Sequence, residues 1–278
     1  MLEALPINLN KIRSVVIEDV IHETPSVKTF IFQDRMSHRA KPGQFLMLWI
    51  PGKEELPMSI MLSEKKWRAA VTIRRLGYGS TALYEKNVGE TIGIRGPYGN
   101  FFTIPSTVSK ALLLGGGTGL APLMRLAKTL SEHKTACTVI IGAKTKDEVF
   151  FERFATNVLS NTHHRIVVTT DDGSYGLEGK ATDAMAHILG VEKFDIVYTC
   201  GPEPMMREVF NIASSHSLPI QASLERHMKC GIGICASCCI DEYLVCKDGT
   251  IFDQDKLANI KDFGKAYRDK SGKKIFYS

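Results

Sequence analysis

The sequence predicts a chain of mixed architecture, in which a small antiparallel β-barrel precedes a doubly wound α/β domain and a short cysteine-rich module. Three observations carry this prediction. Short β-rich runs fill residues 12–100, strands and helices alternate after Pro105, and four cysteines gather near the C-terminus. The chain has 278 residues, of which 44% are hydrophobic, so it is long enough to bury a core in each of two domains.

The first hundred residues predict an all-β domain. Turn-forming pairs such as Pro42-Gly43, Pro51-Gly52 and Gly96-Pro97 separate its short β-rich runs. Strands of this length and spacing indicate a small barrel. The expected strands are residues 14–20, 27–32, 44–50, 57–62, 67–74 and 91–95.

After Pro105 the pattern changes to alternating strands and helices. A continuous apolar run at residues 111–114 enters a glycine-rich turn, and a helix with apolar residues at helical spacing follows. This order implies a parallel, doubly wound sheet. Further strands are expected at residues 137–142, 165–170 and 194–200, and helices at residues 147–154, 181–189 and 203–213.

The glycine-rich turn, residues 115–119, has the composition of a phosphate-binding loop. Glycines let the backbone pass close to a pyrophosphate, and the following helix presents free N–H groups to its negative charge. A tight turn that only packs well is the alternative interpretation. A second loop, Cys-Gly-Pro at residues 200–202, leaves another strand at its carboxyl end, where open α/β sheets bind ligands. Together the two loops predict a nucleotide cleft.

The C-terminal cysteines have the spacing C-x4-C-x2-C-x7-C, which is that of a plant-type 2Fe-2S cluster. Their spacers are small or lack side chains, so backbone N–H groups can donate hydrogen bonds to sulfur. Tetrahedral zinc is the alternative, although zinc usually takes two separated C-x2–4-C pairs or histidines. Cys239 competes with Cys238 for one position, and the C-x2-C spacing favours Cys238. The expected ligands are Cys230, Cys235, Cys238 and Cys246.

The composition and the N-terminal sequence bear on where the protein is located and on whether it forms disulfides. The N-terminus has no basic region followed by an apolar core, and no window approaches eighteen uninterrupted apolar residues. Seven cysteines, most of them grouped as ligands, fit a reducing compartment better than a disulfide framework. We therefore expect a cytoplasmic protein without disulfides or membrane insertion.

Charge is concentrated in residues 256–278. This segment holds seven basic and two acidic residues, which accounts for the whole net charge of +5. A solvated or frayed terminus is one interpretation, and a docking arm for an acidic partner is the sharper one. Nucleic-acid binding is not expected, because no recognised motif accompanies the charge.

The order of the motifs resembles the ferredoxin–NADP reductase superfamily, in which the barrel binds a flavin and the second domain a nicotinamide. The C-terminal half narrows the resemblance to the electron-transfer subunit of two-subunit, NAD-linked dihydroorotate dehydrogenases. The resembling segments are residues 115–122, 171–176, 200–202, 223–228, 230–235 and 246–249. The likeness spans roughly residues 12–255 and implies an FAD-binding barrel at 1–104, an NAD-binding domain at 105–219, a cluster module at 220–255 and a basic tail at 256–278.

The resemblance also implies flavin contacts. The family motif Arg-Pro-x-Ser falls on Leu56-Pro57-Met58-Ser59, so the arginine that pairs with FAD phosphate is missing. Met58 and Ser59 are expected to meet the isoalloxazine ring, although Met58 also suits the barrel core. A pyrophosphate still needs positive charge and directed donors. We assign these to Arg74 and to the backbone around Gly77, Gly79, Ser80 and Thr81.

The nicotinamide nucleotide is expected between the two loops of the second domain. The glycine turn, which is Gly115, Gly116, Gly117, Thr118 and Gly119, is expected to face the pyrophosphate. Cys200, Gly201 and Pro202 are expected at the nicotinamide end, although Cys200 equally suits an inert core thiol. Lys144 and Lys146 would attract the 2′-phosphate of NADP, whereas the neighbouring Asp147 and Glu148 would repel it, so the choice of NAD follows the resemblance.

The function implied by the resemblance is electron transfer. An FMN-containing catalytic subunit would oxidise dihydroorotate in pyrimidine biosynthesis, and electrons would pass through the cluster and FAD to NAD within a heterotetramer. No residue here is expected to be catalytic, since none resembles a base for orotate chemistry. A related ferredoxin- or sulfide-linked NAD(P) oxidoreductase subunit is one alternative, and a zinc-stabilised nucleotide-sensing module is another.

Overall fold

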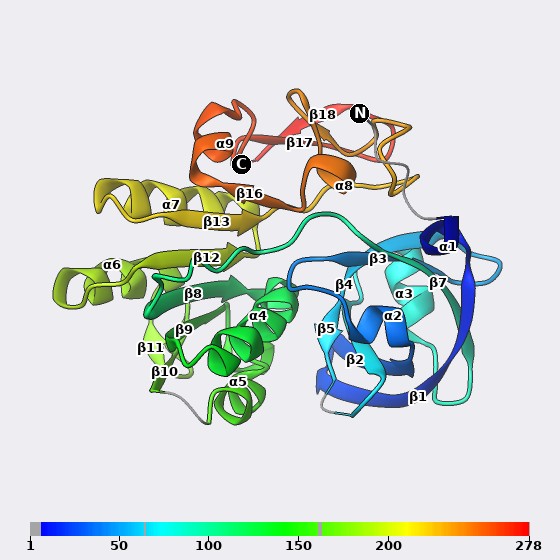
Figure 1. Ribbon diagram of the computed structural model, residues 1–278, viewed down its shortest axis with the longest axis horizontal. Helices are drawn as coiled ribbons and strands as arrows, with labels where there is room; N and C mark the ends of the chain where they lie inside the picture. The colour runs from blue at the N-terminus through cyan, green and yellow to red at the C-terminus, as the bar shows by residue number, and fades with distance from the viewer. Residues whose placement is uncertain (1–6, 64, 161–162, 278) are drawn as a thin grey trace.

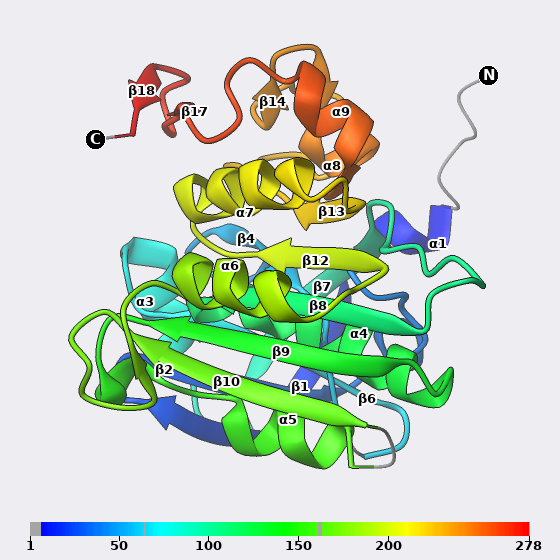
Figure 2. The same ribbon diagram turned by 90° about the vertical axis from the view of Figure 1, so that its left-hand side faces the viewer.

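The computed structural model of the chain describes residues 7–63, 65–160 and 163–277. Two seven-stranded sheets lie side by side, and the C-terminal residues pack beyond one edge of the second sheet (Figures 1 and 2). No helix among the described residues is long and apolar enough to cross a membrane.

The N-terminal sheet is antiparallel and closes into a barrel. Its strand order is β4-β3-β7-β1-β2-β6-β5, and because only Ile60 separates β4 from β5, the two ends of the sheet meet. The predicted barrel is confirmed, except that the run at 57–62 forms two strands around the buried Ile60. The elements are β1 (Arg13–Thr24), β2 (Val27–Gln33), β3 (Phe45–Trp49), β4 (Glu55–Ser59), β5 (Met61–Leu62), β6 (Arg68–Arg74) and β7 (Thr91–Tyr98), with short helices α1 (Ile7–Asn10), α2 (Arg35–His38) and α3 (Tyr78–Tyr84).

The second sheet has the order β11-β10-β9-β8-β12-β13-β16, and its first six strands are parallel. From β8 the chain moves outward to β11 and then returns to β12 on the other side of β8. This reversal brings the glycine turn and residues 200–202 to one switch point, where such sheets bind ligands. The strands are β8 (Lys110–Gly116), β9 (Ala136–Ala143), β10 (His164–Thr170), β11 (Leu177–Glu178), β12 (Ile196–Cys200), β13 (Ile220–Ser223) and β16 (Ile251–Asp253).

Helices cover this sheet much as the sequence predicts, with one exception. The predicted helix at 147–154 is wrong, because the chain forms a 3₁₀ turn η2 (Lys146–Glu148) and helix α5 begins only at Glu152. Phe150 and Phe151 between them are buried and packed edge to face, with ring centroids 4.7 Å apart. Burial of these two adjacent rings outweighs the helical spacing. The helices are η1 (Gly117–Gly119), α4 (Leu120–Glu132), α5 (Glu152–Val158), α6 (Ala181–Val191) and α7 (Glu203–Ser215).

The cysteine-rich loop is an excursion from the edge of the second sheet. It leaves the sheet after β13 and returns in β16, which pairs antiparallel with β13. The predicted boundary between residues 219 and 220 therefore falls at the start of a sheet strand, and the four-part division stays a prediction. The loop contains β14 (Cys239–Ile240), β15 (Tyr243–Leu244) and α8 (Val245–Asp248).

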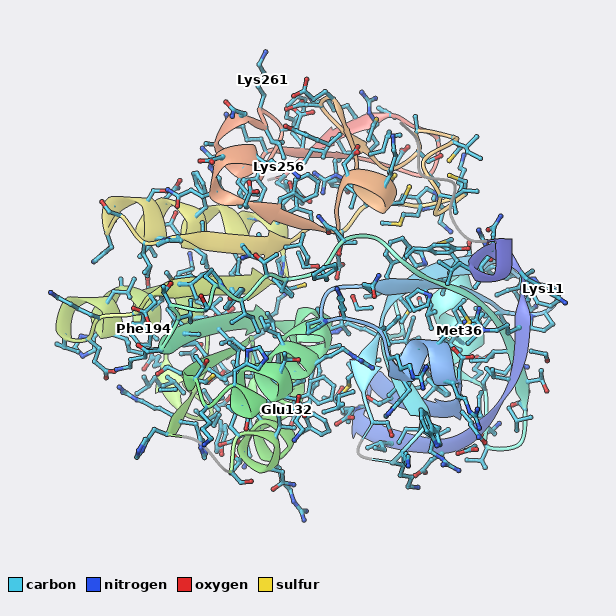
Figure 3. The ribbon with its side chains drawn as sticks, in the orientation of Figure 1. Lys11, Met36, Glu132, Phe194, Lys256 and Lys261 are labelled. Atoms are coloured by element: carbon cyan, nitrogen blue, oxygen red, sulfur yellow. The ribbon has the colours of Figure 1, made fainter. Side chains whose placement is uncertain are left out.

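The basic C-terminal segment is folded rather than frayed, although most of its basic side chains are exposed to solvent. It forms α9 (Gln254–Asn259) and a hairpin of β17 (Ala266–Arg268) and β18 (Lys274–Phe276). Phe263, just before the hairpin, and Ala266, its first residue, are both buried, which explains why the hairpin is ordered despite its charge. Lys261 extends outward from this part of the chain (Figure 3).

Arg125 of α4 fastens the α/β domain to the barrel. Its side chain is only 6% exposed, and burial lowers the pKa of its guanidinium to about 10, so it stays charged at neutral pH. Its nitrogens donate hydrogen bonds of 2.6–3.2 Å to five backbone carbonyl groups of the barrel domain. These acceptors belong to Ser37, His38, Ala40, Ile60 and Met61.

Replacing this residue by Arg125→Met should lower the free energy of unfolding by about 3 kcal/mol, because several buried carbonyl groups lose their donor. Chemical denaturation followed by circular dichroism measures the change. Arg153→Met, at an exposed position of α5, is the matched control and should change stability little. Equal stability of the two variants would contradict the fastening role of Arg125.

Candidate functional site

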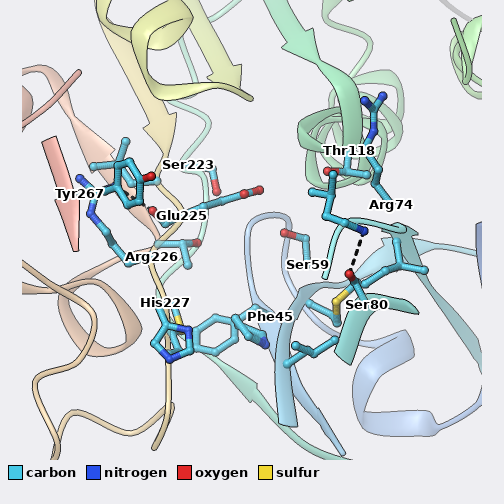
Figure 4. A pocket seen from close by; sticks show the side chains of 18 of the residues that line it. Phe45, Ser59, Arg74, Ser80, Thr118, Ser223, Glu225, Arg226, His227 and Tyr267 are labelled. Carbon is cyan, nitrogen blue, oxygen red and sulfur yellow. Dashed lines mark hydrogen bonds between the residues drawn. The ribbon is translucent and has the colours of Figure 1, made fainter. Parts of the chain in front are cut away.

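A cleft of about 630 Å³ lies between the barrel and the α/β domain. Its lining includes β4, the segment from β6 to α3, the glycine turn, and residues 223–228 at the end of β13 and beyond it. The C-terminal hairpin lines it as well, and Figure 4 shows Tyr267 of β17 across the cleft from Ser59 and Ser80. Segments distant in sequence therefore meet around one space of the size that ligands occupy.

The cleft contains six of the residues predicted to bind the two nucleotides: Pro57, Met58, Ser59, Arg74, Ser80 and Thr118. The Ser80 hydroxyl accepts hydrogen bonds from the backbone N–H groups of Leu76 (3.0 Å) and Gly77 (2.8 Å), which orders the turn before α3. Met58 lines the cleft and also packs in the barrel core, so both roles considered for it are compatible with its position.

Arg74, assigned from sequence to the flavin pyrophosphate, already has a partner. Its Nη1 and Nη2 atoms both donate to Glu148 Oε2 at 3.0 Å. Glu148 belongs to the α/β domain, so this ion pair bridges the two domains at the cleft. The guanidinium is therefore only in part available to a phosphate. No local pattern predicts this pairing, because the two residues are 74 positions apart.

The two loops predicted to form the nucleotide cleft touch one another. A Cβ atom added to Gly119 would lie 2.5 Å from the carbonyl group of Cys200, and one added to Gly201 would lie 2.9 Å from Gly116 N. Glycine at these positions is required by contact between the loops. At Gly117, where φ is +56°, a Cβ atom would meet nothing within 4 Å, so open space remains beside the turn.

Residues near the end of β13, which the sequence motifs did not assign, surround the Cys200 thiol. Cys200 is fully buried; burial, followed by the nearby Glu225 carboxyl, raises the pKa of its thiol well above the usual value. Glu225 itself lines the cleft with an exposed side chain. Cys200 is thus a protonated, unreactive thiol behind the cleft, as the core-thiol interpretation expects.

The four expected cluster ligands lie in one loop as two pairs of thiols. Cys230 lies beside Cys235, and Cys238 lies within hydrogen-bonding reach of Cys246. Their contact lowers the pKa of Cys238 and raises that of Cys246, because the Cys246 thiol donates to the Cys238 sulfur. Among the described residues, no three His, Cys, Asp or Glu side chains lie close enough together to hold one metal ion. Two pairs of thiolates suit two irons, since each iron of a 2Fe-2S centre takes two protein ligands.

Backbone N–H groups point at these sulfur atoms, as the small spacers predict. Three of them, from Ile232, Ile234 and Cys235, donate to Cys230 Sγ at 3.3–3.5 Å. Gly233 N donates to Cys246 Sγ at 3.2 Å. Such donors stabilise thiolates and adjust the potential of a cluster. The Cys239 thiol takes part in no sulfur hydrogen bond that the described residues show, and its backbone pairs with Leu244 instead.

The cysteine loop packs directly on the barrel. A Cβ atom at Gly231, where φ is +72°, would lie 2.6 Å from Met47 Cγ of β3. Met228 lines the cleft and Cys230 is two residues farther, which is at most roughly 7 Å along an extended chain. The cleft and the thiol loop are therefore neighbouring parts of one site.

A buried ion pair anchors this region. Arg226 Nη2 donates to Glu203 Oε1 at 2.9 Å, Arg226 Nη1 donates to Glu203 Oε2, and the two side chains are only 3% and 4% exposed. Glu203 Oε1 also accepts from Gly264 N at 2.8 Å. One carboxylate on α7 thus holds both the segment that enters the cysteine loop and the start of the C-terminal hairpin.

Comparison with known proteins supports both halves of this site. Residues 113–210 match the family model of the oxidoreductase NAD-binding domain, and residues 225–258 match that of the iron-sulfur cluster binding domain of dihydroorotate dehydrogenase B. A probable dihydroorotate dehydrogenase B (NAD(+)) electron transfer subunit of Methanocaldococcus jannaschii is 43% identical over 94% of this chain and 97% of its own length. The chain belongs to this family. The corresponding protein of Thermococcus kodakarensis is 39% identical over 89% of this chain and 99% of its own.

Solved structures of related reductases have the same fold as this chain. A chain of an NADH-dependent reduced ferredoxin-NADP oxidoreductase has a TM-score of 0.78 and 29% identity, covering 87% of this chain and 88% of its own. A ferredoxin NADP+ reductase from Neisseria gonorrhoeae has a TM-score of 0.64 and 19% identity, covering 74% and 92%. The predicted family, fold class and cofactor set of FAD, NAD and an iron–sulfur cluster are confirmed.

Breaking the buried pair by Glu203→Gln should cost about 3 kcal/mol of unfolding free energy, since the Arg226 charge would stay buried without a counter-charge. The C-terminal hairpin should also become more sensitive to limited proteolysis. Glu208→Gln, on the exposed face of the same helix, is the matched control. If both variants unfold at the same denaturant concentration as the wild type, the anchoring role is refuted.

Proposed function

We propose that this chain passes electrons from a dihydroorotate-oxidising subunit through a 2Fe-2S cluster and FAD to NAD. One observation carries the proposal: the segment 223–228 lines the cleft between barrel and α/β domain and continues directly into the four-cysteine loop. A flavin in the cleft and a cluster on the loop would therefore be neighbours, as electron transfer between them requires.

The chain's own residues would position and tune the three cofactors. Cys230 and Cys235 would hold one iron, and Cys238 and Cys246 the other, with backbone N–H groups directed at their sulfurs. When bound, FAD exchanges single electrons with a cluster and a hydride with nicotinamide, so it converts between the two kinds of carrier. Ser59 and Thr118 face the cleft from the barrel and from the glycine turn, where they would orient the flavin and the nicotinamide respectively.

The nicotinamide nucleotide would approach the open space beside Gly117 at the switch point of the second sheet. Gly115, Gly116 and Gly119 shape this turn by packing, and Gly201 and Pro202 support it from the neighbouring loop. NAD is proposed over NADP because the matched relatives are named as NAD(+) subunits. Glu148 is occupied by Arg74, so it adds little repulsion toward a 2′-phosphate.

The catalytic chemistry on dihydroorotate belongs to a partner. The family name, an electron transfer subunit, implies a separate catalytic subunit. We propose that this partner carries FMN, that the two form a cytoplasmic heterotetramer, and that the complex serves pyrimidine biosynthesis. The exposed side chain of Ile234, on the cysteine loop, lies where an electron-donating partner has to approach.

The proposal is tested by producing the chain together with its candidate partner under anaerobic conditions. The complex should contain iron, acid-labile sulfide, FAD and FMN, and it should reduce NAD when dihydroorotate is added. Cofactors without this turnover would favour a ferredoxin- or sulfide-linked reductase instead. A colourless preparation with stoichiometric zinc would favour the nucleotide-sensing alternative.

Cysteine substitutions test the ligand assignment. Cys238→Ser should lose most of the iron, sulfide and visible absorption of the cluster, because one thiolate of a pair is removed. The neighbouring Cys239→Ser is the matched control and should retain all three. The assignment of the third ligand fails if the two variants exchange these results.

A further inference from the structure

If the cleft binds FAD, a positively charged side chain is needed beside the diphosphate of the flavin. This inference therefore rests on the FAD-binding part of the proposed function. The flavin dinucleotide carries a diphosphate, which needs nearby positive charge and directed donors. Leu56 stands where the resembled motif has arginine. The substitute must be another cationic side chain that reaches the same part of the cleft.

Two of the cationic side chains that line the cleft already form ion pairs with carboxylates. Arg74 donates through both terminal nitrogens to Glu148, and Arg226 forms the buried pair with Glu203. Moving Arg226 to a phosphate would leave the buried Glu203 carboxylate without its partner. The Arg74 side chain is only 25% exposed, and both of its terminal nitrogens are held by Glu148. Neither residue replaces the missing arginine at low energetic cost.

The remaining cations of the cleft come from the C-terminal hairpin. Arg268 and Lys270 both line it. The Arg268 guanidinium is directed back into the hairpin, where Nη1 donates to the carbonyl oxygen of Gly272 at 3.0 Å. Lys270 instead reaches across to the barrel, where Nζ donates to Glu54 Oε2 at 2.9 Å. It is the lysine that crosses from the hairpin to the flavin side of the cleft.

The position of Glu54 shows which part of the barrel the Lys270 side chain reaches. Glu54 lies two residues before Leu56, and its carboxylate fills the space where a Cβ atom of Gly79 would be. Gly79 belongs to the turn that we assign to the flavin pyrophosphate. Lys270 thus ends between the strand that lacks the arginine and the turn that leads into α3.

The ion pair between Lys270 and Glu54 is weak enough to be exchanged. The Lys270 side chain is 66% exposed, and exposed pairs contribute only about 0–1 kcal/mol. A dianionic diphosphate at the turn would attract the ammonium group more strongly than one carboxylate does. Lysine also suits this task, because it acts as a mobile point charge on a flexible stem.

We propose that Lys270, from the C-terminal hairpin, supplies the positive charge for the FAD diphosphate that Leu56 cannot supply. The hairpin is then part of the flavin site and closes it from the side opposite the barrel. While the site is free of flavin, Lys270 neutralises Glu54, and on binding it turns to the phosphates. The diphosphate of NAD has the same chemistry, but the contact with Glu54 assigns the lysine to the barrel side.

The test uses the full-length chain freed of flavin and titrated with FAD, with riboflavin and with NAD. Lys270→Met should raise the dissociation constant for FAD roughly tenfold, as expected for loss of a charge-assisted hydrogen bond. Riboflavin has no phosphate, so its binding should be unchanged. The loss should shrink at high ionic strength, because exposed charges are screened. Lys270→Arg should keep most of the affinity.

Lys273→Met is the matched control, since it removes the same charge from the same hairpin at a position outside the cleft. It should leave FAD binding unchanged. The inference is overturned if Lys270→Met binds FAD like the wild type, weakens riboflavin equally, or weakens only NAD. A wild-type chain that binds no FAD would overturn the proposed function as well, so the two failures are distinguishable.

Discussion

The site depends on how firmly the barrel and the α/β domain are held together, because the cleft exists only between them. Arg125 fixes their spacing deep in the interface through five carbonyl groups, and Arg74 bridges to Glu148 at the cleft. Both contacts use guanidinium groups, whose planar donors keep direction as well as distance. A fixed gap allows two ligands to lie against each other with little rearrangement, which is the condition for hydride transfer.

A second constraint ties the cluster to this gap. The chain passes from β13 along the cleft, through Arg226, and directly into the cysteine loop. The Glu203 carboxylate holds Arg226 on one side and Gly264 on the other, so one buried charge positions both the loop and the hairpin. Electron transfer falls steeply with distance, and a loop anchored at both ends in one sheet keeps that distance constant. This arrangement requires a buried ion pair, and removing its two charges from water is energetically unfavourable.

Local patterns predicted most of the fold, and long-range contacts account for what they missed. Strand alternation and helical spacing are properties of a few neighbouring residues, so the barrel and the α/β alternation could be read from them. The helix at 147–154 failed because two adjacent phenylalanines are drawn into the core. The C-terminal hairpin was missed because its charge suggests solvent, whereas Phe263 and Ala266 hold it against the protein. Pairs such as Lys270 with Glu54 join residues 216 positions apart, which no local window contains.

The four-cysteine motif identifies its ligand more specifically than the glycine-rich turn does. Four thiols at fixed spacing serve a metal cluster because iron sets both the number and the position of its ligands. Glycines, in contrast, are required wherever two backbones approach, and Gly119 and Gly201 are explained by the contact between their own loops. Of the glycines in these two loops, Gly117 is the one that borders open space. A glycine-rich turn therefore indicates close packing first, and it indicates a nucleotide only when a cleft beside it is shown.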